Sequence, residues 1–344
     1  MANPILVEVT RGPLVESVHR GAVAIARADG SLLFAAGDTE TPIFPRSSLK
    51  PIQALPMVES GAVDAFGLGD EEIALACASH SGEPMHTTRV EAWLRKIGCS
   101  EEDLACGPHP VRYGPVWTEM VRHGSRPTRI HNNCSGKHTG FLTTARHWGI
   151  ATDGYERVHH PVQEAVAKTL NELAGLSGDL PWGVDGCAAP NFALSLAAFA
   201  RALARLADSS SMAQPRADAI KRIVRAMIAH PELVAGTGRS DTILIQACGG
   251  RAATKAGAEG IYAAIIPETG LGIALKIDDG AGRAAETAVA AILDKLAVLG
   301  GDPAAHKLVR APVLNTRGAT VGERRAAATL TDLEIETLPS RAVF

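Results

Sequence analysis

The sequence predicts an α+β fold in which strands from both ends of the chain form one antiparallel sheet and the middle of the chain forms a helical lobe. Strand-like segments occur near the N-terminus and again after residue 250. Between them, apolar residues recur at helical spacing in one segment after another. We expect a single domain over residues 1–344, with the sheet from about 1–45 and 250–344 and the helical lobe from about 46–249.

The composition narrows the class of protein. Of the 344 residues, 46% are hydrophobic and only 4% are aromatic, so alanine, glycine and valine must fill the core. The net charge of −3 is spread over interspersed acids and bases, which argues against nucleic acid or an anionic membrane as a partner. No apolar run reaches the roughly 18 residues that a membrane helix needs.

The cysteines and the N-terminal residues indicate the cellular compartment. The 6 cysteines are irregularly spaced, which does not indicate a disulfide framework. Residues 1–9 lack the basic segment and the uninterrupted apolar core of a signal peptide. We therefore expect a cytoplasmic protein whose reduced thiols are either buried or available for a metal.

The expected strands are valine-rich or alternating segments bounded by turn residues. They are residues 5–9, 15–27, 31–36, 261–266, 272–278 and 309–314. Ala28-Asp29-Gly30 joins one pair into a hairpin, and residues 267–270 join another. A polar tail is expected after the last strand.

The expected helices show apolar residues at 3.6-residue spacing together with end signals. They are residues 70–78, 83–97, 161–173, 191–207, 216–229 and 283–299. Asp70 is the expected N-cap of the first, with acids in its first turn. The glycine-rich turn at 236–241 ends in another N-cap candidate, Ser240 or Asp241.

A Ser-x-x-Lys motif, Ser47 to Lys50, follows the first hairpin. On a helix, three residues turn the chain by about 300°, so the two side chains share a face. A desolvated, neutral lysine can take the proton of a serine hydroxyl. Alone the motif is weak, because a solvated helix start is the commoner setting. Pro51 leaves open whether these residues form a first helical turn or precede a helix that begins at Pro51.

Three further polar stretches interrupt the helical lobe. Residues 79–82 follow an apolar helix, where an ordinary helix end is an equally good interpretation. Residues 131–140 precede a helical segment at 141–148, and a helix N-terminus there would suit an anion such as a carboxylate. A nucleotide site is rejected, because G-x-x-x-x-G-K-[ST] is incomplete and no strand leads in. Residues 185–190 form a tight polar turn.

Six motifs along the chain carry a resemblance to a known family. They are Arg46–Pro51, Cys77–Glu83, His131–Gly140, Asp185–Pro190, Gly236–Arg239 and Lys255–Glu259. In outline, Ser-x-x-Lys, a serine loop and a lysine-glycine motif near a late strand resemble the serine β-lactamase and penicillin-binding fold. The full set resembles more closely the rhizobial-type, β-lactamase-like, zinc-binding L-asparaginases, over nearly the whole chain.

This resemblance implies an L-asparaginase that converts L-asparagine to L-aspartate and ammonia through an acyl-enzyme. It also implies two catalytic Ser–Lys pairs, Ser47 with Lys50 and Ser79 with Lys255. Ser47 would attack the side-chain amide with Lys50 as base, while Ser79 relays a proton. Ser47 is chosen by its spacing to Lys50, and Ser79 is chosen over Ser81 by its motif position.

The resemblance further implies one accessory Zn²⁺, bound by Cys134, Lys137 and Cys187. Cys-x-x-Lys spacing alone does not suggest zinc, and without the family two buried thiols are the simpler interpretation. A lysine must also lose its proton before it coordinates a metal. We expect the zinc to hold two polar loops together and to help place the substrate, while the Ser–Lys pairs supply the nucleophile.

The substrate carries an α-carboxylate and an α-ammonium group. Arg46 and His138 are assigned to the carboxylate and Asp185 to the ammonium, with a plain salt bridge as an equal alternative for Arg46. The family also implies a homodimer. Other classes considered are a β-lactamase-like esterase or hydrolase, a zinc amidohydrolase whose metal activates water, and a zinc-stabilised scaffold without activity.

Overall fold

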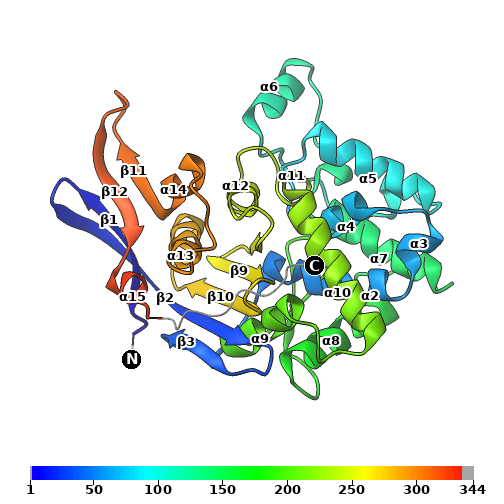
Figure 1. Ribbon diagram of the computed structural model, residues 1–344. Coiled ribbons are helices and arrows are strands. Elements are labelled where there is room, and N and C mark those ends of the chain that lie inside the picture. The colour runs from blue at the N-terminus through cyan, green and yellow to red at the C-terminus, as the bar shows by residue number, and fades with distance from the viewer. Residues whose placement is uncertain (1, 335–344) are drawn as a thin grey trace.

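A computed structural model describes residues 2–334 and shows an antiparallel sheet beside a body of helices (Figure 1). The sheet strands are β1 (Ile5–Arg11), β2 (Leu14–Arg27), β3 (Leu32–Ala36), β8 (Ala253–Ala256), β9 (Ile261–Ile266), β10 (Leu271–Ile277), β11 (Arg310–Leu314) and β12 (Thr320–Ala326). Their order is β11-β12-β1-β2-β10-β9-β8, and β3 pairs with β2. The predicted α+β class, with one sheet built from both chain ends, is therefore confirmed.

Strand β12 was not predicted. Its sequence, Thr-Val-Gly-Glu-Arg-Arg-Ala, is polar, and its residues are exposed or half-buried, so it resembles a polar tail. It is nevertheless a strand because β1 pairs with it, with Val7 opposite Ala326. β1 also pairs with β2 across the turn at Gly12 and Pro13, so the N-terminal hairpin is a three-stranded unit.

The two faces of the sheet pack against different helices. Along β2, Ala22, Ala24 and Ala26 belong to the core shared with the helical lobe. Val23 and Ile25 alternate with them and belong to a second core, which contains buried residues of α13 (Gly282–Lys295). This period of two is what a strand imposes, and it buries both faces.

Helix α9 (Leu196–Ala207) lies on the alanine-lined face of the sheet. At Gly272 of β10 the approach is so close that a Cβ atom would lie 2.1 Å from the backbone nitrogen of Ala204. Small side chains on the strands permit this contact. The abundance of alanine and glycine in the sequence thus serves close packing of helix on sheet.

Most of the remaining helices form the helical lobe. Helices α14 and α15 follow later in the chain and pack against α13. The helices are α1 (Lys50–Gln53), α2 (Leu55–Glu59), α3 (Ala62–Ala65), α4 (Asp70–Ala76), α5 (Pro84–Lys96), α6 (Gly114–Arg122), α7 (Ser135–His147), α8 (Pro161–Ala174), α10 (Gln214–Ala229), α11 (Pro231–Val234), α12 (Ser240–Ala247), α14 (Pro303–Val309) and α15 (Ala328–Thr331). Short 3₁₀ turns are η1 (Arg46–Leu49), η2 (Glu101–Asp103) and η3 (Arg129–His131). Two small antiparallel pairs of strands join β4 (Pro42–Ile43) to β7 (Leu194–Ser195) and β5 (Trp182–Val184) to β6 (Pro190–Phe192). No helix among residues 2–334 is long and apolar enough to cross a membrane.

Several predicted helix ends were wrong. Helix α7 begins at Ser135, within the polar stretch that was expected to be a loop, and the helix expected from residue 191 begins at Leu196. Gly69 is the N-cap of α4 in place of Asp70, and its N–H donates to Glu72 Oε2 at 2.8 Å. The N-cap of α12 is Arg239, so neither Ser240 nor Asp241 holds that position.

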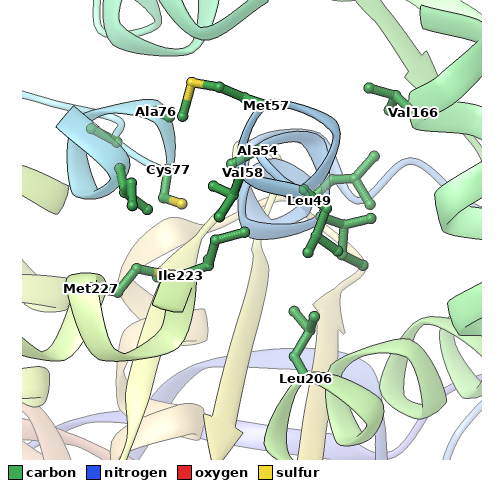
Figure 2. Close-up of a cluster of buried hydrophobic side chains, with 14 of the residues drawn as sticks. Leu49, Ala54, Met57, Val58, Ala76, Cys77, Val166, Leu206, Ile223 and Met227 are labelled. Carbon is green, nitrogen blue, oxygen red and sulfur yellow. The ribbon is translucent and has the colours of Figure 1, made fainter. Parts of the chain in front are cut away.

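The Ser-x-x-Lys segment rests on a buried hydrophobic cluster (Figure 2). Leu49 of η1 shares this cluster with Met57 and Val58 of α2 and with Ile223 of α10. Fully burying one such side chain contributes about 1.5–3 kcal/mol. The segment is therefore held on a rigid base.

Candidate active site

Residues Ser47 to Lys50 form the turn through which η1 runs into α1. The Lys50 N–H donates to the Ser47 carbonyl, and Pro51 occupies the first turn of α1. Of the two alternatives, Ser47 to Lys50 therefore make a first helical turn. Ser47 is half-buried, whereas Lys50 is buried. Arg46 has φ of +51°, a left-handed conformation that is uncommon for a non-glycine residue.

Two buried lysines converge on one serine. Lys50 Nζ lies 3.0 Å and Lys255 Nζ 2.9 Å from Ser79 Oγ. Both lysines are 1% exposed and Ser79 is 6% exposed. Ser79 lies in the loop after α4, and Lys255 lies on β8, so the contact joins the helical lobe to the sheet. Three of the four predicted catalytic residues are thus directly hydrogen-bonded.

Among residues 2–334, neither the Ser47 hydroxyl nor the Ser81 hydroxyl is hydrogen-bonded to Lys50 or Lys255. Within residues 2–334 no hydrogen bond joins Ser47 Oγ to Lys50 Nζ, although both lie on one helical turn; Lys50 donates to the Ala78 carbonyl and to Ser79 Oγ. Ser81 Oγ donates to the Ala235 carbonyl at 2.9 Å, so it points away from the lysines. Ser79, the serine chosen by motif position, is the one that both lysines contact.

A close contact between α4 and α7 aligns the site loops. A Cβ atom at Gly136 would lie 2.2 Å from the carbonyl oxygen of Leu75, so only glycine fits there. The residues flanking this contact are joined by hydrogen bonds: His80 N–H donates to the Asn133 carbonyl at 3.2 Å, and Lys50 Nζ to the same oxygen at 3.5 Å. The glycine therefore sets how near the polar segment 131–140 comes to Ser79.

Asp241 is a site residue that the sequence reasoning missed. Its carboxylate is 1% exposed, accepts hydrogen bonds from Thr254 Oγ1 and the Ala256 N–H at 3.0 Å, and lies 3.8 Å from Lys255 Nζ. Burial lowers the pKa of Lys255 to about 7; Asp241 opposes this shift and the charge of Lys50 adds to it. In the sequence, Asp241 beside a glycine-rich turn indicated only a helix cap.

Cys134, Lys137 and Cys187 meet as the resemblance implied. They are 4%, 5% and 4% exposed, and Lys137 Nζ lies 2.9 Å from Cys187 Sγ. Cys187 comes from the turn between β5 and β6, whereas Lys137 lies on α7. Two segments far apart in the chain therefore supply the three side chains.

The protonation of this trio bears on metal binding. A hydrogen bond from Cys134 and the charge of Lys137 outweigh burial and lower the pKa of Cys187 to about 4. The same hydrogen bond raises the pKa of Cys134 to about 12, and the two sulfurs outweigh burial to raise the pKa of Lys137. Two thiolates and an amine are donors that suit zinc once Cys134 and Lys137 have each lost a proton. In the described part of the chain no cluster of three His, Cys, Asp or Glu could hold a metal, so a site here requires the lysine.

The three residues assigned to the substrate have partners within the protein. Arg46 Nε donates to Asp185 Oδ2 at 2.8 Å, so these two pair with each other. His138 is 0% exposed, and its Nδ1 lies 2.7 Å from the hydroxyl of Tyr155. Burial, with the charge of Lys137, lowers the pKa of His138 to about 3. Its imidazole is therefore neutral and offers a carboxylate no charge.

An open surface groove lies elsewhere. It has a volume of about 810 Å³ and is lined by residues of the β1–β2 turn and of β11 and β12, among them Thr10, Arg310 and Glu323. None of the predicted site residues lines it. We therefore place the chemistry at the buried Ser–Lys contact, where the ionisable groups converge.

The chain is similar to several known proteins over most of its length. Among solved structures it is similar to a putative β-lactamase from Bacteroides dorei DSM 17855, at 15% identity over 75% of this chain and 84% of that chain, with a TM-score of 0.41. It is also similar to a β-lactamase from Mycobacterium bovis (15% identity, 80% and 94% covered, TM-score 0.38) and to a simvastatin synthase (LovD) mutant from Aspergillus terreus (12%, 84% and 89%, 0.38). No curated protein sequence matches. A family model described as L-asparaginase II matches residues 7–326, which is most of the chain, and the protein therefore belongs to the L-asparaginase II family.

Proposed function

We propose that the protein is an L-asparaginase that hydrolyses the side-chain amide of L-asparagine through a Ser–Lys activated nucleophile. Membership of the L-asparaginase II family supports an amidohydrolase. The observation that carries the mechanism is the convergence of Lys50 and Lys255 on Ser79 Oγ in a buried site. A scaffold without activity has no need of two lysines buried around one hydroxyl, since burying such charges is costly.

In the proposed reaction Ser47 Oγ attacks the side-chain carbonyl carbon of asparagine, and Lys50 accepts its proton. The carbon–nitrogen bond breaks, ammonia leaves with a proton passed through Ser79, and an aspartyl ester remains on Ser47. Water then attacks the ester carbon, which releases L-aspartate and restores the serine. A pKa of about 7 lets Lys255 hold or release a proton near neutral pH.

Ser79 is a second candidate for the nucleophile. It makes hydrogen bonds to both lysines, whereas the Ser47 hydroxyl makes none to Lys50. A nucleophile within hydrogen-bond reach of its base is the usual geometry, although such contacts are often longer before substrate binds. In this variant Lys50 or Lys255 takes the Ser79 proton and passes it to the departing ammonia, the aspartyl ester forms on Ser79, and water then releases L-aspartate and restores Ser79.

We further propose that Cys134, Lys137 and Cys187 hold one accessory Zn²⁺. Their burial and their donor atoms fit such an ion, and Lys137 would bind it as a neutral amine. When bound, zinc supplies a Lewis acid that helps orient the substrate. Cys187 and Asp185 share one turn, so the ion would also fix the Asp185–Arg46 pair.

A cytoplasmic homodimer is the proposed working form. Leu14, Val18 and Leu314 are 72%, 39% and 55% exposed on the extension formed by β1, β2, β11 and β12. Exposed large apolar side chains on a projecting sheet fit burial against a second copy. Sedimentation at several protein concentrations tests this, and a monomer at all of them would contradict it.

The activity is tested by ammonia release from L-asparagine, with the wild type beside Ser47→Ala and Ser79→Ala. Acid quenching followed by peptide mass analysis locates the aspartyl ester and so decides between the two serines. Ser81→Ala is the matched control, because its hydroxyl contacts the Ala235 carbonyl. A wild type that releases no ammonia, with or without added zinc, would refute the L-asparaginase proposal; nitrocefin and esters would then test a β-lactamase-like hydrolase.

A further inference from the structure

Two arginines outside the predicted set are held beside the Ser–Lys site. The segment bearing Arg239 is tied at one end, where the Thr237 N–H donates to Glu83 Oε1 at 2.8 Å. At its other end Asp241 lies 3.8 Å from Lys255 Nζ. Arg239 lies on this tied segment, two residues before Asp241, and its positive charge acts on Lys255.

Arg112 approaches from the opposite side of the serine loop. Its backbone N–H donates to the carbonyl of Ser81 at 3.0 Å, two residues from Ser79. Arg112 is nevertheless an exposed residue, so its side chain lies on the solvent side of the site. Partial desolvation and then the charge of Arg239 lower the pKa of Arg112.

Neither guanidinium has an acceptor in the described part of the chain. No hydrogen bond or ion pair of either side chain occurs among residues 2–334, and Arg239 Nη1 is a buried atom without a partner. Buried polar atoms are nearly always hydrogen-bonded, so an orphaned guanidinium nitrogen needs an explanation. The carboxylate close by, Asp241, faces Lys255, so the two guanidinium groups have no counter-ion of their own, which indicates a site for an anion.

The proposed substrate brings an anionic group of the right kind. Its α-carboxylate has no free partner among the residues first assigned to it, because Arg46 pairs with Asp185, and His138 is fully buried with its Nδ1 against the Tyr155 hydroxyl. A guanidinium binds a carboxylate through two parallel hydrogen bonds, which fixes its orientation as well as its charge.

We propose that Arg239, assisted by Arg112, binds the α-carboxylate of the substrate and so selects amino-acid amides over neutral amides. This inference rests on the L-asparaginase reaction proposed above. It makes Arg239 a specificity-determining residue, because an amide without the carboxylate leaves the buried Nη1 of Arg239 without a partner.

The test compares L-asparagine with 3-aminopropanamide, which keeps the amide and the amine but has hydrogen in place of the carboxylate. For Arg239→Gln we expect kcat/KM on L-asparagine to fall about ten- to a hundredfold, mainly through KM, as for the loss of a charged hydrogen bond. Activity on 3-aminopropanamide should change little, so the preference for L-asparagine collapses. Arg239→Lys should restore part of the loss because it keeps the charge without the fork, and Arg112→Gln should show the same pattern more weakly.

Inhibition by L-aspartate gives a second readout that does not require turnover of the slow substrate. Its inhibition constant should rise in Arg239→Gln by a factor similar to that of KM, whereas inhibition by β-alanine, which lacks the α-carboxylate, should not change. Arg122→Gln is the control, since that guanidinium is exposed on α6 and pairs with Glu119. Thermal melting checks that each variant is folded.

The outcomes separate this inference from the proposed function. An active wild type whose KM for L-asparagine is unchanged in Arg239→Gln overturns the arginine site and leaves the L-asparaginase proposal standing. A wild type inactive on L-asparagine overturns the proposed function. In that case calorimetric binding of L-aspartate still decides whether Arg239 binds a carboxylate, because equal affinity for wild type and Arg239→Gln would refute it.

Discussion

The protonation of Lys255 depends on its burial and on its charged neighbours. Burial favours its neutral form, Asp241 favours the charged form, and the nearby positive charge of Lys50 favours the neutral form again. The balance places the pKa at about 7, where a proton relay is most effective. Asp241 also accepts the Ala256 N–H and Thr254 Oγ1, so it positions β8 as well as tuning its lysine.

This balance predicts the pH dependence of activity. If neutral Lys255 is required, kcat/KM should rise with pH through about 7, because the neutral amine becomes populated above its pKa. Asp241→Asn removes the charge that favours the ammonium form, so the rise should move to lower pH. A pH profile of kcat/KM for both proteins measures this. Thr254→Val is the control, because it removes a hydrogen bond to Asp241 but keeps the charge; an unshifted rise in Asp241→Asn would contradict the prediction.

Replacing Lys50 tests the other lysine. Lys50→Met keeps the buried chain but removes the donor to Ser79 Oγ and to the Ala78 carbonyl. We expect kcat to fall by about 10²–10⁴, the usual contribution of a general base. Ammonia release measures it, with Lys276→Met as the control, since that lysine lies on β10 and donates to the Ile277 carbonyl. Wild-type kcat in folded Lys50→Met would exclude Lys50 as the base.

At the scale of elements, two glycines set how closely helices approach. Gly272 lets α9 lie on β10, and Gly136 lets α7 meet the end of α4. In both places the nearest atoms belong to backbone, which yields less readily than a flexible side chain. Because α7 carries Lys137 and the loop before it carries Asn133, the second contact also controls the site.

Gly136→Ala should therefore affect stability and activity together. A Cβ atom 2.2 Å from the Leu75 carbonyl forces α7 away from α4, and overpacking of this kind costs about 1–3 kcal/mol. Urea unfolding measures the free energy, and ammonia release measures the loss at the site. Gly282→Ala, at the start of α13, is the control, since nothing lies within 4 Å of the added atom. Equal stability of Gly136→Ala and wild type would refute the close contact.

At the scale of the whole molecule, the site is assembled where the sheet meets the helical lobe. β8 brings Lys255 from the C-terminal part of the chain to Ser79 in the helical part. The turn between β5 and β6 brings Cys187 to Lys137 on α7. The proposed zinc would thus tie two segments that the chain separates widely.

Removal of the proposed zinc should loosen this junction. Chelation should raise KM for L-asparagine more than it lowers kcat, and it should lower the melting temperature, since a ligand at a hundred times its Kd stabilises by about 2.7 kcal/mol. Native mass spectrometry measures the bound metal, with Cys187→Ala expected to carry none and Cys248→Ala as the thiol control. Zinc retained at full occupancy by Cys187→Ala would contradict the ligand set.

The sequence by itself determined the local features of the fold. The strands near each end and the hairpins follow from periodicity and turn residues, which act over a few positions. Pro51 left open whether Ser47 to Lys50 form a helical turn, and the structure decided it. The polar motifs likewise marked every loop that reaches the site. Strand β12 escaped because its polar residues gain strand structure only by pairing with β1.

Which side chains meet was decided only by the tertiary structure. Spacing placed Lys50 on the face of Ser47, yet its hydrogen bond goes to Ser79; Arg46 was assigned to the substrate, yet it pairs with Asp185. Arg239 stood in one of the six motifs but had no role assigned to it, and Asp241 carried no signal beyond a glycine-rich turn. The physical reason is that hydrogen bonds and ion pairs depend on distances of about 3 Å, which packing of remote elements sets, whereas local sequence sets only the face on which a side chain lies.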